Sequence, residues 1–120
     1  MSSETPILDD NVIAELRESV GGDDAFVIDL ASTYLAEGPE HLRALEEAVA
    51  MADVAAAVRP AHTLKSSSAS LGAMRLSEIS RGIEHAAREG QADGLADAVA
   101  EAKAAWVETV AQMRERGMTT

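Results

Sequence analysis

The chain contains 120 residues, of which 47% are hydrophobic and 26% are charged, a composition typical of one soluble globular domain with a single buried core. It has no cysteine, which excludes disulfide scaffolds, thiolate metal sites and cysteine nucleophiles. Its formal net charge of -11 repels phosphate backbones and anionic membrane surfaces, so nucleic acid is a poor candidate partner.

The sequence carries no signal for export or membrane insertion. Its first residues include neither a basic segment nor an apolar stretch, and no apolar run is long enough to span a bilayer. We therefore expect a cytoplasmic protein that does not bind membranes.

Residue usage favours helices. Phe, Tyr and Trp occur once each, and β-branched residues are few beside Ala, Leu, Glu and Arg, which have high helix propensity. We therefore predict an all-α protein, divided into helices by its glycines and prolines.

A short helix is expected first. Asp9 or Asp10 can cap it, and Gly21-Gly22 can end it after about three turns. Its apolar residues recur at helical spacing: Val12, Ile13, Leu16 and Val20.

A long helical stretch follows. Asp23 or Asp24 can cap it, and its apolar positions continue to Val49. We expect Gly38-Pro39 to kink or break this helix, because proline lacks the amide hydrogen and disfavours helical backbone at the preceding residue.

Three more helices fill the second half of the chain. Asp53 opens the third helix and Gly72 closes it, with Pro60 inside, where we expect a bend or a late helix start. The fourth helix runs from about Leu76 up to Gly90, and the fifth includes Leu95 to Met113.

Short connections between long amphipathic helices favour antiparallel neighbours. We therefore predict an up-down antiparallel four-helix bundle, with the short first helix covering one end. The bundle domain is expected to span residues 9–116, with tails at residues 1–8 and 117–120.

The segment from residue 61 to 73, AHTLKSSSASLGA, combines one histidine with unusually small side chains. With Leu64 facing the core, His62 points roughly 160° away, so we expect it to face solvent. Lys65 and Ser66 follow His62 by three and four residues, the spacings at which side chains meet along a helix.

An exposed imidazole beside a cation, a hydroxyl and a flat floor of small residues suits phosphorylation of the imidazole. Phosphoryl transfer needs in-line access for the nucleophile and compensation of the charge on the phosphoryl oxygens. His62 can supply the nucleophile, and Lys65 can supply part of the compensation.

This segment resembles the signature of histidine-containing phosphotransfer (HPt) domains, His-x-Leu-Lys-Gly-Ser-(Ser/Ala)-x-x-Leu-Gly-Ala. The resemblance covers most of the chain. Further matching residues are Gly21-Gly22-Asp23, Phe26, Leu42, Leu45, Ala48 and Asp53 upstream, and Leu76 and Ile83-Glu84 downstream.

The resemblance implies a four-helix bundle with one exposed histidine, which takes a phosphoryl group from the aspartyl phosphate of a receiver domain and passes it to another receiver. It implies that His62 is the acceptor and that Lys65 steadies the phosphoryl group. Glu84 stands where some members have a glutamine that bonds the histidine ring. Ser66 stands where glycine is the commonest residue.

Several neighbouring residues have more than one interpretation. Ser67 and Ser68 are read as small packing residues, whereas Ser66 can be either a packing residue or a phosphate contact. Glu84 is interpreted as a surface carboxylate or an orienting partner for His62, rather than a catalytic base. The other two histidines, His41 and His85, have no comparable setting, and we expect no metal site.

The docking surface for a receiver domain is expected to centre on His62, flanked by Val58, Arg59 and Ala69 as well as Lys65 and Ser66. Receiver domains of a hybrid sensor kinase or of response regulators are the expected partners of a monomeric chain. We expect no cofactor on this chain, because the Mg²⁺ of the reaction belongs to the receiver.

Two enzyme classes are disfavoured. A Gly-x-Ser-x-Gly elbow is missing, which argues against a serine hydrolase, and phosphate-binding glycine loops are missing, which argues against ATP binding and self-phosphorylation. We predict a phosphoryl carrier, a phosphorelay intermediate of a two-component system. The alternative is a helical adaptor that binds a receiver or kinase through the same face without being phosphorylated.

Overall fold

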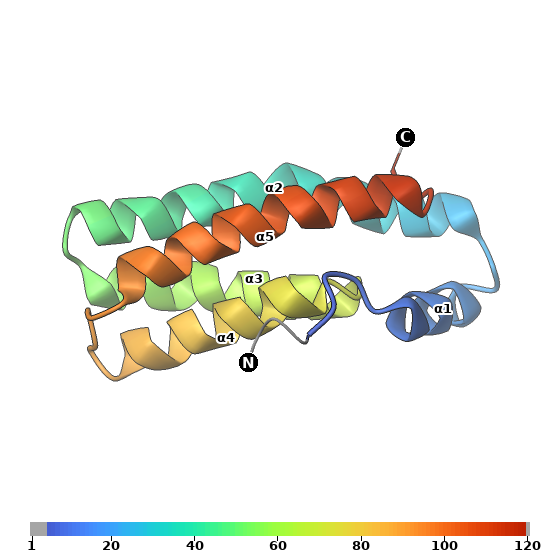
Figure 1. The fold of residues 1–120 in the computed structure, drawn as a ribbon. Coiled ribbons are helices and arrows are strands. Elements are labelled where there is room, and N and C mark those ends of the chain that lie inside the picture. Colours follow the sequence, from blue (N-terminus) through green and yellow to red (C-terminus); the bar gives the residue numbers. More distant parts are fainter. Residues whose placement is uncertain (1–4, 120) are drawn as a thin grey trace.

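The computed structural model describes residues 5–119. Within this range all regular secondary structure is helical, which confirms the predicted all-α class. Four helices lie side by side, and a shorter one sits at one end of the elongated molecule (Figure 1).

The short helix α1, Asp10–Ser19, begins and ends where its residues predict. Asp9 is its N-cap and accepts a hydrogen bond from the amide of Asn11. The long helix α2, Asp24–Ala50, is capped in the same way by Asp23, whose carboxylate accepts the amides of Ala25 and Phe26. In both α1 and α2, an aspartate just before the helix thus accepts hydrogen bonds from amides that have no partner inside the helix.

We expected a kink or a break at Gly38-Pro39, and the break is wrong, because α2 continues through both residues. A kink within the continuous helix stays a prediction. Gly38 is buried, and a Cβ atom at this position would overlap the ring of Trp106 on α5. The Trp106 ring also packs at a tilt on Tyr34, with ring centroids 5.1 Å apart. Gly38 therefore serves close packing of α2 and α5, and this packing outweighs the local helix-breaking tendency of Pro39.

Gly38→Ala should lower the free energy of unfolding by about 1–3 kcal/mol, the usual cost of overpacking a core. Urea denaturation measures it. Gly82→Ala is the matched control, because Gly82 lies inside a helix and a Cβ atom there would meet no neighbouring atom within 4 Å, so alanine should raise stability by about 0.5–1 kcal/mol. Equal effects of the two substitutions would contradict the packing role of Gly38.

The late helix start at Pro60 is confirmed. A single 3-10 turn, η2 (Val54–Ala57), is capped by Asp53, and α3, Val58–Ser70, begins only after it. Pro60 is the third residue of α3, in the first turn, where the missing amide hydrogen removes no helical hydrogen bond.

The last two helices are α4, Met74–Arg88, and α5, Leu95–Glu115. In the packing, α3 contacts α2 and α4, and α5 contacts α4 and α2. Large side chains fill the space between these helices without exposure to solvent: Leu45, Leu64, Leu76, Ile83 and Met113.

The core extends into both segments that we expected to be tails. Ile7 and Leu8 are buried, and so is Met118 near the other end. Backbone hydrogen bonds join the N-terminal segment to the turn before α4 and to the first turn of α4, from the Asp9 amide to the Gly72 carbonyl and from the Arg75 amide to the Pro6 carbonyl. Residues 1–4 and 120 of these segments lie outside the described range, and the boundaries of the domain stay a prediction.

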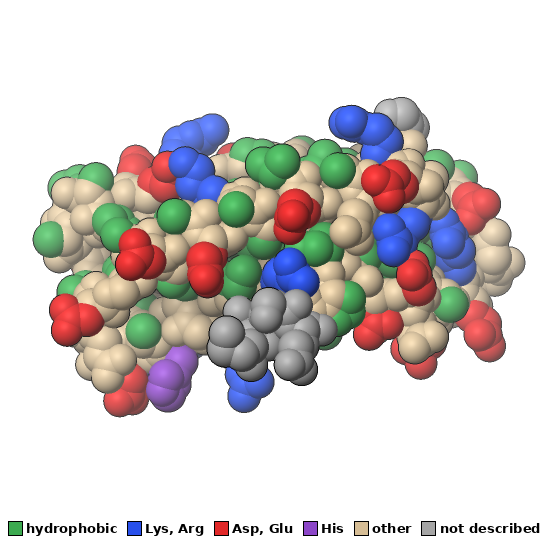
Figure 2. Space-filling model, viewed as in Figure 1, with side chains coloured by type: hydrophobic (Ala, Val, Ile, Leu, Met, Phe, Trp, Pro, Cys, Tyr) green, Lys and Arg blue, Asp and Glu red, His purple; other side chains and the backbone are tan. Residues whose placement is uncertain are grey.

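Within residues 5–119, no helix is both long enough and apolar enough to cross a membrane. Figure 2 shows acidic side chains spread over the visible face, with basic ones between them.

Candidate functional site

The buried side of α3 is fixed by small and apolar side chains. Ala61, Leu64 and Ser68 are buried, and the Ser68 hydroxyl lies 2.7 Å from the hydroxyl of Tyr34 on α2. Ser67 is half-buried and donates to the carbonyl of Thr63 within the helix. These contacts agree with the packing interpretation of Ser67 and Ser68.

His62 lies on the opposite side of α3, with 54% of its side chain exposed. The solvent-facing orientation expected from helical spacing is therefore confirmed. Its Nδ1 atom, however, lies 2.9 Å from Oε2 of Glu84 on α4. One edge of the ring is thus held by the protein while the ring as a whole stays accessible.

Glu84 is buried, with 8% of its side chain exposed, which excludes the surface interpretation. Its two oxygens have different partners. Lys65 Nζ lies 2.7 Å from Oε1, whereas His62 and Arg88 both contact Oε2. The free-energy cost of burying this carboxylate is therefore offset by its ion pairs with Lys65 on α3 and Arg88 on α4.

These partners set the ionisation of Glu84. Hydrogen bonds from Lys65 and then Arg88 lower the pKa of its carboxyl from 4.5 to about 2, with a smaller contribution from His62, although burial acts in the opposite direction. Glu84 is therefore a carboxylate at neutral pH, and an ionised carboxylate only accepts hydrogen bonds. In the neutral form of the His62 imidazole, Nδ1 must then carry the hydrogen, which leaves Nε2 with its lone pair free.

The ionisation of Glu84 predicts a pH dependence of stability. A carboxyl group whose pKa is lower in the folded state stabilises the fold above its ordinary pKa and loses this contribution as the pH falls through its folded pKa. We expect the difference in unfolding free energy between wild type and Glu84→Gln to shrink between about pH 4.5 and 2. Urea denaturation at a series of pH values measures it, and a difference independent of pH would contradict the buried ion pairs.

The remaining residues that the sequence singled out lie around His62 on α3. Ser66 and Arg59 are exposed, whereas Val58 and Ala69 are half-buried. Val58 packs partly against the core. Ala69 is thus more enclosed than the open floor that we expected.

Sequence reasoning missed Arg88. It donates from Nε and Nη2 to Oε2 of Glu84, at 3.1 and 2.8 Å. A signal was present, because Arg88 follows Glu84 by four residues, the spacing of a helical ion pair. The burial of Glu84 that makes this pair important depends on the packing of α3 against α4.

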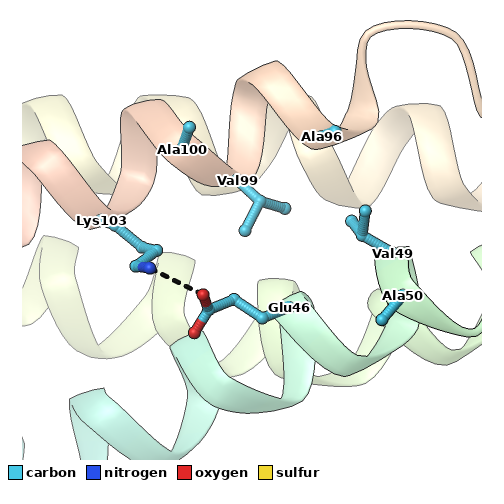
Figure 3. A pocket seen from close by; sticks show the side chains of 7 residues that line it. All are labelled: Glu46, Val49, Ala50, Ala96, Val99, Ala100 and Lys103. Carbon is cyan, nitrogen blue, oxygen red and sulfur yellow. Dashed lines mark hydrogen bonds and ion pairs between the residues drawn. The ribbon is translucent and has the colours of Figure 1, made fainter.

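The site is an exposed surface. A groove of about 240 Å³ lies elsewhere, between α2 and α5, where Glu46 and Lys103 form an ion pair of 2.6 Å beside Val49 and Val99 (Figure 3). Its charged groups are paired, so it offers no free group for chemistry. Among the described residues, no three side chains of His, Cys, Asp or Glu are grouped so as to hold a metal ion.

The fold and the site define a helical protein that presents one half-exposed imidazole, oriented by a buried carboxylate. The sequence matches the family model of the Hpt domain over residues 29–116, and the chain belongs to this family. Hpt proteins are phosphoryl carriers rather than enzymes in the usual sense, and they interact with receiver domains of two-component systems.

A solved structure has the same fold: histidine-containing phosphotransfer protein B (HptB) from Pseudomonas aeruginosa PAO1. The TM-score is 0.82 at 24% sequence identity, over 95% of this chain and 96% of that one. Comparison with curated proteins gave no match.

Proposed function

We propose that this protein is a phosphorelay intermediate. It accepts a phosphoryl group on His62 from the aspartyl phosphate of one receiver domain and passes it to an aspartate of another. The observation that carries this proposal is the geometry of His62, whose Nδ1 is bonded to the ionised Glu84 while the ring is half exposed.

The transfer is a simple exchange of bonds. The lone pair of Nε2 attacks the phosphorus, the P–O bond to the aspartate breaks, and its electron pair returns to the aspartate carboxylate. The imidazole keeps its hydrogen on Nδ1 and gains positive charge, which the Glu84 carboxylate stabilises across 2.9 Å. The reverse sequence passes the group to a second receiver.

Lys65 is the proposed phosphoryl contact. It lies one turn after His62 on α3, and its ammonium is held beside the site by Glu84. An ammonium on a flexible stem can turn from the carboxylate to phosphoryl oxygens as negative charge arrives. Ser66 is small and exposed, so it leaves room for the donor receiver domain to approach His62.

The docking surface is proposed to surround His62 on α3, with Arg59 and Val58 toward the start of the helix and Ser66 and Ala69 toward its end. Receiver domains of a hybrid sensor kinase or of response regulators are the proposed partners. A receiver reaches an exposed helix face, whereas a small donor would be held better by a cleft.

The remaining chemistry is assigned to the partner. We propose that the chain acts as a cytoplasmic monomer without a cofactor or ATP site and that the Mg²⁺ of the reaction is held by the receiver. The chain then neither phosphorylates itself nor hydrolyses a substrate.

The arrangement of helices is part of the proposal. Helices α2 to α5 are proposed to form an up-down antiparallel four-helix bundle, supported by their short connections and by the pairing of α5 with α2. In such a bundle α3 and α4 are neighbours, which lets one helix supply the imidazole and the other its carboxylate.

Incubation with a phosphorylated receiver domain tests the function. The proposal expects a phosphate on this chain that is labile in acid and stable in base, as a phosphoramidate bond is. A receiver that binds the chain but transfers nothing to it would favour the adaptor alternative.

A further inference from the structure

The two cations that contact Glu84 are not equivalent. Lys65 contacts Oε1, whereas Arg88 contacts Oε2, the oxygen that also faces Nδ1 of His62. Arg88 uses two nitrogens, Nε and Nη2, on this single oxygen. Arg88 therefore holds the oxygen that faces His62, whereas Lys65 holds the other oxygen of the same carboxylate.

The chemistry of the two side chains strengthens this difference. Arg88 and Glu84 lie one turn apart on α4, so their pairing needs no contact with another helix. A guanidinium donates from a planar fork, which restricts the carboxylate more than a single ammonium does. When Lys65 turns from Oε1 toward a phosphoryl group, as the proposed function has it, Arg88 stays on Oε2 of Glu84.

We propose that Arg88 is a positioning residue that keeps Oε2 of Glu84 on the Nδ1 hydrogen of His62, so that Nε2 stays free when Lys65 turns to the phosphoryl group. The part played by Lys65 rests on the proposed function. The effect of Arg88 on the ring hydrogen does not, because it exists in the unphosphorylated protein.

Nitrogen-15 NMR of the unphosphorylated full chain measures this effect directly, at a pH where the imidazole of His62 is neutral. In the wild type we expect the hydrogen on Nδ1. In Arg88→Gln we expect a mixture with the Nε2-H form, and in Arg88→Lys a smaller change.

Two further variants complete the NMR test. Lys65→Ala should keep the hydrogen on Nδ1, because Arg88 still holds Oε2. Arg81→Gln is the matched control, since Arg81 is an exposed arginine on the same helix. A wild-type distribution of the hydrogen in Arg88→Gln would overturn the proposal.

Chemical phosphorylation gives a second readout, with phosphoramidate as the donor. Nε2 attacks the phosphorus of phosphoramidate whose nitrogen is protonated, the P–N bond breaks, and its electron pair leaves with the nitrogen as ammonia. Arg88→Gln should slow this reaction by about tenfold, the lower end of what is lost when a partner that orients a metal-bound imidazole is removed.

The same substitution in a Glu84→Gln background separates positioning from direct contact. If Arg88 acts through Glu84, Arg88→Gln should add little to the effect of Glu84→Gln. Equal slowing in both backgrounds would overturn the proposal and place Arg88 on the phosphoryl group itself. If phosphoramidate labels His62 in none of the proteins, the wild type included, the proposed function is contradicted. The NMR result would still decide the role of Arg88.

Discussion

In His62→Gln protein, transfer from a phosphorylated receiver domain should fall to background while the fold is retained. The substitution removes the nucleophilic nitrogen, and no other described group is held by Glu84 in the same way. The glutamine amide can still donate to Glu84, so unfolding free energy should change by no more than about 1 kcal/mol. Radiolabel transfer and urea denaturation measure the two quantities.

The other histidines provide matched controls. His85 is exposed on α4 and His41 is half-buried on α2. Glutamine at either position should leave transfer to His62 intact. Label that persists in His62→Gln and disappears in one of these controls would move the acceptor to that histidine.

A bulky residue at position 66 should block transfer from a receiver domain. Ser66 is exposed one turn after His62, so the side chain in Ser66→Trp would stand where the partner must approach. Displacement by about 1 Å can cost a factor on the order of a hundred in rate, and we expect at least this loss. Stopped-flow measurement of transfer and circular dichroism melting test rate and fold together.

A smaller phosphoryl donor supplies a control for Ser66→Trp. Phosphoramidate is small, so it should still phosphorylate Ser66→Trp at a rate close to that of the wild type. Ala104→Trp on α5 is the matched surface substitution, because Ala104 is also exposed. If neither the receiver domain nor phosphoramidate phosphorylates Ser66→Trp, or if its melting temperature drops by a large amount, the substitution has damaged the site rather than blocked the approach.

Position 66 is a cleaner test than position 69, which helical spacing places on the same face as His62. Ala69 is half-buried, so a large side chain there would disturb packing as well as docking. The helical period correctly predicted that position 66 is exposed, but it did not predict that position 69 is half-buried, because enclosure depends on the neighbouring helices.

The sequence determined the features that depend on local chemistry. Aspartates before the first three helical segments, glycines after α1, α3 and α4 and the period of apolar residues predicted five helices at nearly the observed limits. Pro60 predicted the late start of α3, because a proline costs least in the first turn of a helix, where its missing amide hydrogen would have no partner. The exposure of His62 and its closeness to Lys65 followed from positions on one helix.

Only the tertiary structure decided what depends on contacts between helices. Local rules predicted a kink or a break at Gly38-Pro39, but the Trp106 ring from α5 occupies the space beside this glycine and α2 continues without a break. Glu84 was open between a surface and an orienting role until the packing of α3 against α4 buried it. Burial makes its charge costly unless it is paired, and for this reason Lys65 and Arg88 gather on its oxygens, one of which faces Nδ1 of His62.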